Sequence, residues 1–311
     1  MAKNTNLHKA QQTKNDEFYT QLVDIENELK YYRHHFIGKV VYCNCDDPRE
    51  SNFCKFFSMN FKSLGLKKLI STGYNENGKG VKLVYMGDKN GNCMPDFNEI
   101  EVLTELEGNG DFRSLECIEL LKESDIVVTN PPFSLFREYV ATLVEYNKKF
   151  LILGNNNAIK YKEIFPLFKE NKLWLGISSN KTMEFRLSDS YEKFNRIENG
   201  VKFGKVPAIS WFTNLEHNRR NQPINLYMKY SNEYFPKYDN YDAIEVSKTR
   251  EIPIDYDGVM GVPITFLTKY CHEQFEIIGI ANHGSDNIYD VFEPILNSKK
   301  IYTRILIKHR R

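Results

Sequence analysis

Residues 125–133 read DIVVTNPPF, an apolar run that ends in asparagine, two prolines and phenylalanine. The run is short and rich in β-branched residues, and turn-forming residues follow it, so it predicts a buried strand over 125–129. The apolar spacing after it predicts a helix over 134–146. In an open parallel sheet, ligands bind beyond the carboxyl ends of the strands. We therefore expect the chemistry of this protein in the loop Asn130–Phe133.

The segments around this loop alternate between strand and helix patterns. The expected strands lie at 39–43, 67–70, 81–86, 125–129 and 150–153. The expected helices lie at 21–36, 51–64, 113–122, 134–146 and 159–170. Parallel strands need crossover connections, which are usually helices that cover the sheet. The pattern therefore predicts an α/β fold with a Rossmann-like, largely parallel sheet and helices on both faces.

The pattern changes beyond about residue 171. Shorter strands without long helices between them are expected at 174–177, 183–187, 201–203 and 208–213, as at an antiparallel edge. From residue 216 onward the chain is rich in Tyr, Asn and Pro. We expect a catalytic domain over 1–215, beginning with an arm and a helix over 1–36, and a smaller lobe over 216–311.

The composition is that of a folded protein, with 41% hydrophobic and 27% charged residues among 311. No apolar run reaches the roughly 18 residues of a membrane span. The six cysteines form no CxxC pair, which argues against a zinc site and a disulfide framework and favours a reducing, cytoplasmic location. The net charge of +1 hides two basic ends, since residues 1–15 and 294–311 contain no acid. Such ends favour contact with a polyanion, although solvated tails are an equal alternative.

The Asn-Pro-Pro-Phe loop suits a planar amine as substrate. Each proline fixes φ and removes a backbone donor, and Asn130 is held extended by the proline that follows it. The side-chain oxygen of Asn130 and the carbonyl of Pro131 can then accept the two hydrogens of one amino group, beside the flat face of Phe133. The exocyclic nitrogen of adenine is a weak nucleophile whose lone pair such acceptors would expose. The alternative is a turn whose prolines merely start the next helix.

The NPPF loop resembles the catalytic motif of amino-methyltransferases that use S-adenosylmethionine. Over most of its length the chain resembles the EcoRI-type adenine-specific DNA methyltransferase family, which implies a class I methyltransferase sheet and a C-terminal recognition lobe. The stretches that carry the resemblance are DEFYT at 16–20, CNCDDP at 43–48, SNF at 51–53, GDFRS at 110–114, residues 125–137, WFTNL at 211–215 and residues 257–267.

The resemblance implies a role for each matched residue. The residues implied to hold the target base are Asn130, Pro131, Pro132 and Phe133. The residues implied to bind S-adenosylmethionine are Phe18, Tyr19 and Thr20 at its methionine part, Asp46, Asp47 and Pro48 at its amino acid group, and Asp111 and Phe112 at its adenine. No metal is implied. A helix N-cap and its neighbour is the alternative for Asp46 and Asp47.

Two features differ from the usual class I pattern. The glycine-rich turn after the first strand is replaced by CNCDDP, and no acid ends the second strand at 71–73, where a partner for the ribose would usually sit. Glu76 is the nearest substitute in the sequence.

A base inside duplex DNA must leave the stack to reach such a loop, at a cost of roughly a few kcal/mol. Phe133 could stack on it, with Trp211 or Phe212 on the other side, although a core position is the alternative for both. Arg219 and Arg220 are candidates for groove or backbone contact, with a solvated turn as the alternative. Arg304 and Lys308 in the basic C-terminal segment are candidates for phosphate contact.

These observations predict a cytoplasmic, S-adenosylmethionine-dependent DNA methyltransferase that modifies the N6 amino group of adenine. Its expected partners are double-stranded DNA and a cognate restriction endonuclease at the same site, and we expect a monomer without a membrane partner. The alternatives are an RNA or protein-glutamine amino-methyltransferase and a non-catalytic DNA-binding protein on the same fold. The intact NPPF loop argues against the last. No cysteine follows a proline, which argues against cytosine-C5 chemistry.

Overall fold

The computed structural model describes residues 18–45, 47–87, 100–187, 191–192, 194–282 and 293–310, with the side chains of 100–102 left out. The chain divides into two compact units. The first contains the residues up to Asn156 together with Ser178–Leu215, and the second contains Asn157–Ile177 together with the residues from Glu216 onward. Residues 157–177 thus group with the C-terminal part of the chain, whereas the sequence-based division placed them in the catalytic domain.

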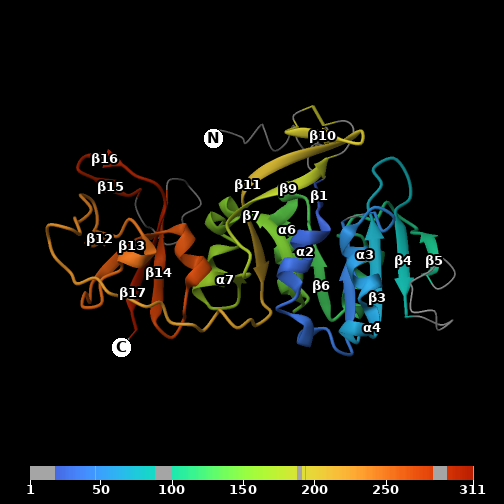
Figure 1. Ribbon diagram of the computed structural model, residues 1–311, viewed down its shortest axis with the longest axis horizontal. Coiled ribbons are helices and arrows are strands. Elements are labelled where there is room, and N and C mark those ends of the chain that lie inside the picture. Colours follow the sequence, from blue (N-terminus) through green and yellow to red (C-terminus); the bar gives the residue numbers. More distant parts are fainter. Residues whose placement is uncertain are drawn as a thin grey trace. The chain divides into compact units, whose positions relative to one another are not determined.

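A large mixed sheet forms the centre of the first unit (Figure 1). Its strands, in spatial order, are β1 (Phe18–Thr20), β9 (Lys181–Leu187), β11 (Val201–Thr213), β7 (Lys149–Asn155), β6 (Ile126–Thr129), β2 (Val40–Cys43), β3 (Lys68–Gly73), β4 (Val81–Tyr85) and β5 (Ile100–Glu105), and β10 (Arg196–Glu198) pairs with β11. The strands β7, β6, β2 and β3 are parallel to one another, and their outer neighbours are antiparallel. The predicted α/β fold is confirmed.

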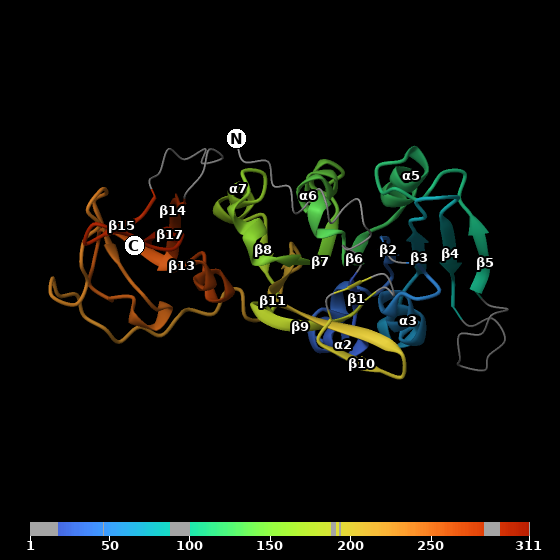
Figure 2. The same ribbon diagram turned by 90° about the horizontal axis from the view of Figure 1, so that it is seen from above.

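Helices cover both faces of this sheet, with α2 (Leu22–Leu29) and α3 (Asn52–Met59) on one face and α5 (Leu115–Glu123) and α6 (Phe136–Glu145) on the other (Figure 2). Four of the five predicted helices are interrupted. Residues 21–36 form α2 and the 3-10 turn η1 (Arg33–His35), residues 51–64 form α3 and α4 (Phe61–Leu64), and residues 134–146 form η2 (Phe133–Leu135) and α6. Residues 159–170 form the end of η3 (Asn156–Lys160) and, after a break, α7 (Phe165–Lys169). Ser51 caps α3 by accepting from the backbone of Cys54 at 3.3 Å.

The second unit contains a four-stranded sheet in the order β12 (Ala243–Glu245), β13 (Val259–Pro263), β17 (Arg304–His309) and β14 (Phe275–Ala281). Its remaining elements are η3 (Asn156–Lys160), shared with the first unit, α7 (Phe165–Lys169), β8 (Trp174–Leu175), η4 (Thr249–Glu251), η5 (Ile264–Lys269) and the β15–β16 hairpin (Ile295–Leu296 and Lys299–Lys300). The core side chains Ile305, Leu306 and Ile307 lie on β17 between two partner strands. The basic C-terminal segment therefore includes an interior strand and is not only a solvated tail.

Within the described ranges, no helix has the length and apolar character needed to cross a membrane.

Candidate active site

Asn130 stands at the carboxyl end of β6 and is only 7% exposed. Its Nδ2 donates to the backbone carbonyl of Phe18 at 2.6 Å. Its Oδ1 is buried and accepts no hydrogen bond within the described part of the chain. A buried acceptor without a donor costs about 1–3 kcal/mol, so such atoms are rare in folded proteins. The amide is therefore fixed on one side and open to a donor on the other.

The rest of the NPPF motif forms the turn into α6. Pro131 is buried, and Pro132 caps the 3-10 turn that begins at Phe133. The half-buried ring of Phe133 stacks on the ring of Phe18, with centroids 5.8 Å apart and planes at 28°. Phe18 thus meets the motif twice, through its carbonyl at Asn130 and through its ring at Phe133.

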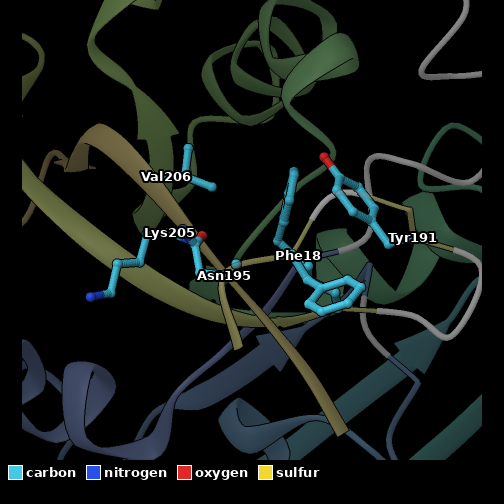
Figure 3. A pocket seen from close by; sticks show the side chains of 8 residues that line it. Phe18, Tyr191, Asn195, Lys205 and Val206 are labelled. Carbon is cyan, nitrogen blue, oxygen red and sulfur yellow. The ribbon is translucent and has the colours of Figure 1, made fainter. Parts of the chain in front are cut away.

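A pocket with a cavity volume of about 270 Å³ adjoins Phe18 (Figure 3). Its lining residues are Phe18, Leu187, Tyr191, Phe194, Asn195, Gly204, Lys205 and Val206. The ring of Tyr191 packs on Phe18 with centroids 5.8 Å apart. The pocket therefore offers aromatic walls next to the motif. Sequence reasoning missed Tyr191 and Asn195. Both follow β9 in the chain, and only the pairing of β1 with β9 brings them into the pocket with Phe18.

Strand β1, which contributes Phe18 to this pocket, makes further contacts within the first unit. The backbone carbonyl of Thr20 accepts from Asn52 Nδ2 at 2.7 Å, which fixes β1 to the start of α3. The Oγ1 of Thr20 is buried and lacks a hydrogen-bond partner among the described residues. The guanidinium of Arg186 lies over the ring of Tyr19, 4.3 Å from its centroid.

The loop after β2 holds Asp47, while Asp46 lies outside the described residues. Asp47 accepts from Arg49 Nε and from the backbone of Arg49, both at 2.9 Å. Partial burial raises the pKa of Asp47, but the hydrogen bonds from Arg49 outweigh it and leave the pKa below its usual value. Pro48 is buried. Since Ser51 is the N-cap of α3, the alternative of a helix cap at Asp47 does not hold.

Two glycines outside this loop allow neighbouring backbone segments to approach the end of β3 closely. A Cβ on Gly73, at the end of β3, would lie 2.7 Å from the Cα of Asp47. A Cβ on Gly110, which has φ +81°, would lie 2.4 Å from the carbonyl oxygen of Gly73. The loops that carry Asp47 and Asp111 therefore both approach the end of β3 at backbone contact.

Asp111 and Phe112 follow Gly110 directly. The carboxylate of Asp111 accepts from Arg113 Nε at 2.9 Å and Nη2 at 2.7 Å, and these bonds lower the pKa of Asp111. Arg113 also donates to Glu138 at 2.8 Å. Phe112 is buried against the edge of the Tyr139 ring, with centroids 5.0 Å apart. S-adenosylmethionine carries an ammonium group, an adenine amino group and an aromatic ring. These groups fit the carboxylates of Asp47 and Asp111, the ring of Phe112 and the hydroxyl of Thr20.

The structure corrects the prediction for Trp211. Its side chain is 1% exposed and packs edge-on against Phe53, and its neighbour Phe212 packs against Phe136. Strand β11 is paired along both edges, and the side chains of Trp211 and Phe212, which point to opposite faces, are both buried. Neither ring can stack on a base from these positions, and both belong to the core.

Two of the predicted DNA-binding arginines are used inside the second unit. Arg304 is 13% exposed and binds the buried Glu245 through Nε and Nη2. Arg220 lies over the ring of Trp174, pairs with Glu216 and donates to Asn171 at 2.7 Å. We therefore assign both to packing and no longer propose them as DNA contacts.

Arg219 and Lys308 differ from these two arginines. Arg219 is exposed and makes one long hydrogen bond, 3.5 Å to the carbonyl of Ile177. Lys308 is half-buried on β17. Both remain candidates for contact with phosphate. No group of three His, Cys, Asp or Glu side chains that could hold a metal ion occurs in the ranges that the structure describes.

Known proteins are similar to this chain over nearly its whole length. A family model described as "Adenine-specific methyltransferase EcoRI" matches residues 6–310. The chain is 50% identical to Type II methyltransferase M.EcoRI of Escherichia coli, over 100% of this chain and 98% of that protein. It is 44% identical to Type II methyltransferase M.MpnI of Mycoplasma pneumoniae, over 98% of each chain.

A third relative, Type II methyltransferase M.MgeORF184P of Mycoplasma genitalium, is 41% identical over 98% of this chain and 99% of its own length. The resemblance that the sequence stretches around NPPF suggested is thereby confirmed. The chain belongs to the EcoRI family of adenine-specific methyltransferases.

Proposed function

We propose that this protein transfers a methyl group from S-adenosylmethionine to the N6 amino group of an adenine that has been rotated out of duplex DNA. Membership in the family makes the protein an adenine-specific methyltransferase. The observation that supports this chemistry is the buried Oδ1 of Asn130 at the carboxyl edge of the sheet, an acceptor to which no residue in the described ranges donates.

The protein's part in the reaction is to hold the amino group. Asn130 Oδ1 would accept one N–H, and the carbonyl of Pro131, whose direction the two prolines restrict, would accept the other. Both bonds strengthen as the nitrogen gains positive charge, so they stabilise the transition state more than the bound substrate. The nitrogen lone pair would form a bond to the methyl group that the cofactor supplies, the cofactor would leave as a neutral thioether, and the proton that the nitrogen loses would pass to water.

The bound cofactor supplies an electrophilic methyl group. Asp47 would accept from its ammonium group, Asp111 from its adenine amino group, and Phe112 would pack on its adenine ring. Thr20 would pair its open hydroxyl with a polar atom of the methionine part. The Rossmann-like details of this cradle are part of the same proposal.

The second unit would recognise the DNA site, with Arg219 and Lys308 contacting phosphates. The relatives' names as Type II methyltransferases support a role in restriction-modification beside a cognate endonuclease. A monomer in the cytoplasm remains our expectation.

The direct test is incubation of the purified protein with labelled S-adenosylmethionine and, separately, duplex DNA, RNA or protein. Label in DNA that digests to N6-methyladenine is the expected result. Label in RNA or in glutamine alone would refute the proposal in favour of the other amino-methyltransferases. DNA binding without any label transfer would favour a non-catalytic protein.

A further inference from the structure

Asn44, the first residue after β2, sits at the centre of a buried hydrogen-bond group in the first unit. Its backbone carbonyl accepts from Thr129 Oγ1, and its side-chain Oδ1 accepts from the hydroxyl of Tyr139. Asn44 is 4% exposed, and Thr129 and Tyr139 are buried. Thr129 immediately precedes Asn130, and Tyr139 lies on α6, which the NPPF motif leads into. One residue therefore touches both sides of the motif.

These bonds lie where β2 and β6 separate. The two strands pair at Val41–Ile126 and Tyr42–Val127. Two positions further along each strand, the side-chain hydroxyl of Thr129 reaches the backbone carbonyl of Asn44. Separation of adjacent strands opens the crevice in which sheets of this kind bind ligands. The hydroxyl of Thr129 thus joins the two loops across the edge where the crevice begins.

The loop after Asn44 needs such support. Cys45 has φ +76°, a left-handed conformation that costs a residue with a side chain about 1–2 kcal/mol. The Sγ of Cys45 donates to Asn44 Oδ1 at 3.6 Å, so the same oxygen holds the strained residue. Asp47 follows two residues later, and its backbone position depends on this bend.

Tyr139 reaches both ends of the cofactor cradle. Its hydroxyl binds Asn44, and its ring packs against Phe112. Burial raises the pKa of Tyr139, so its hydroxyl keeps the proton that it donates at neutral pH.

We propose that Asn44, held by Thr129 and Tyr139, is a positioning residue that fixes the cofactor loop relative to the Asn130 acceptor. This inference rests on the proposed function. Methyl transfer needs nitrogen, methyl carbon and sulfur in line, and a displacement of about 1 Å can lower the rate by up to about a hundredfold. The contacts that bind the cofactor would move together with their loops, so binding would change less than the chemical step.

The test is the Tyr139→Phe variant, which keeps the ring against Phe112 and removes only the hydroxyl. We expect the single-turnover rate of methyl transfer at saturating S-adenosylmethionine to fall about tenfold. The dissociation constant of the cofactor, measured by calorimetry without DNA, should change less than about threefold. Thr129→Val removes the other bond to Asn44 and should behave in the same way, while Thr129→Ser keeps the hydroxyl and should restore the rate.

Tyr32→Phe is the matched control. Tyr32 is also buried, and its hydroxyl donates at 2.9 Å to Glu28 on α2, outside the two loops of the proposed site. A merely structural role for Tyr139 would lower the melting temperature and leave the rate per folded molecule unchanged. Rates within about twofold of the native enzyme for both Tyr139→Phe and Thr129→Val, or an equal fall in Tyr32→Phe, would overturn the inference. Absence of adenine methylation by the native protein in the same assay would instead refute the proposed function.

Discussion

Asn130 in the first unit and Glu245 in the second are both buried polar residues, but their surroundings differ. The carboxylate of Glu245 accepts from Arg304, from the Tyr238 hydroxyl at 2.5 Å and from the Ser247 hydroxyl at 3.3 Å. The amide of Asn130 makes one bond through Nδ2 and leaves Oδ1 open. A saturated buried group holds its neighbours in place, whereas an open one is suited to a substrate. Glu245 is thus satisfied within the fold, whereas Asn130 keeps the available acceptor that its proposed function requires.

Among the variants that test this comparison, Glu245→Ala is expected to have the largest effect, a loss of stability. Removal of the carboxylate leaves the guanidinium of Arg304 buried without its partner, which costs about 3–5 kcal/mol of stability. Denaturant unfolding of the variant should show this loss. Lys300→Gln breaks the more exposed pair with Glu293 and should change stability much less. Equal losses in the two variants would mean that burial does not set the strength of these pairs.

Asn130→Ala tests the buried residue whose side-chain acceptor is available. Loss of one preorganised transition-state contact should lower methyl transfer by about two orders of magnitude, with little change in cofactor affinity. Single-turnover kinetics and calorimetry measure the two quantities.

Asn214→Ala is the control for Asn130, because the amide of Asn214 is paired on both sides. It accepts from the backbone of Phe150 and donates to the carbonyl of Lys148, both at 2.9 Å. This variant should lose stability and keep its rate per folded molecule. Near-normal turnover in Asn130→Ala would remove that residue from the mechanism.

Asp111 is an intermediate case, a carboxylate that is paired with Arg113 yet partly open to solvent. If it also accepts from the cofactor, Asp111→Ala removes a charge-assisted hydrogen bond and should weaken cofactor binding about tenfold. DNA affinity should change less. Calorimetry with S-adenosylmethionine and with duplex DNA compares the two, and the reverse order would overturn the assignment of Asp111.

Lys308 extends the comparison to the basic strand β17, where Arg304 is paired with Glu245. Lys308→Gln should reduce the slope of log affinity for DNA against log salt by about 1, the contribution of one phosphate contact. A salt titration of DNA binding measures the slope. An unchanged slope would show that Lys308 does not touch DNA.

The sequence contains enough to predict the alternation of strands and helices and the position of NPPF at a strand end. Both are local signals, because the spacing of apolar residues and the conformational effect of a proline involve only a few neighbouring residues. It does not contain the pairing of β1 with β9, which brings Phe18 and Tyr191 to the motif from distant parts of the chain.

Trp211 and Arg304 show the same limit, because the sequence predicted them as DNA contacts and the structure packs both against other protein side chains. An aromatic residue in a strand and an arginine in a basic segment give no local sign of burial. Their surroundings come from residues far away in the sequence, since Phe53 packs on Trp211 and Glu245 pairs with Arg304. The close approach of Gly73 to Asp47 is also a tertiary contact, which no local pattern in the sequence shows.

The smallest effect is expected from acidification at His217, a partly buried ring whose Nε2 lies 3.0 Å from the carbonyl of Leu175 in the same unit. Burial lowers the pKa of His217 below its ordinary value of 6.5. The unfolded chain therefore binds a proton at a higher pH than the folded chain does, and stability falls as the pH drops through 6.5. Melting temperatures between pH 8 and pH 5 should decline less steeply in His217→Gln than in the native protein. Parallel declines would show that the ring takes up its proton in the folded state as readily as in water, so that burial does not set the charge state of His217.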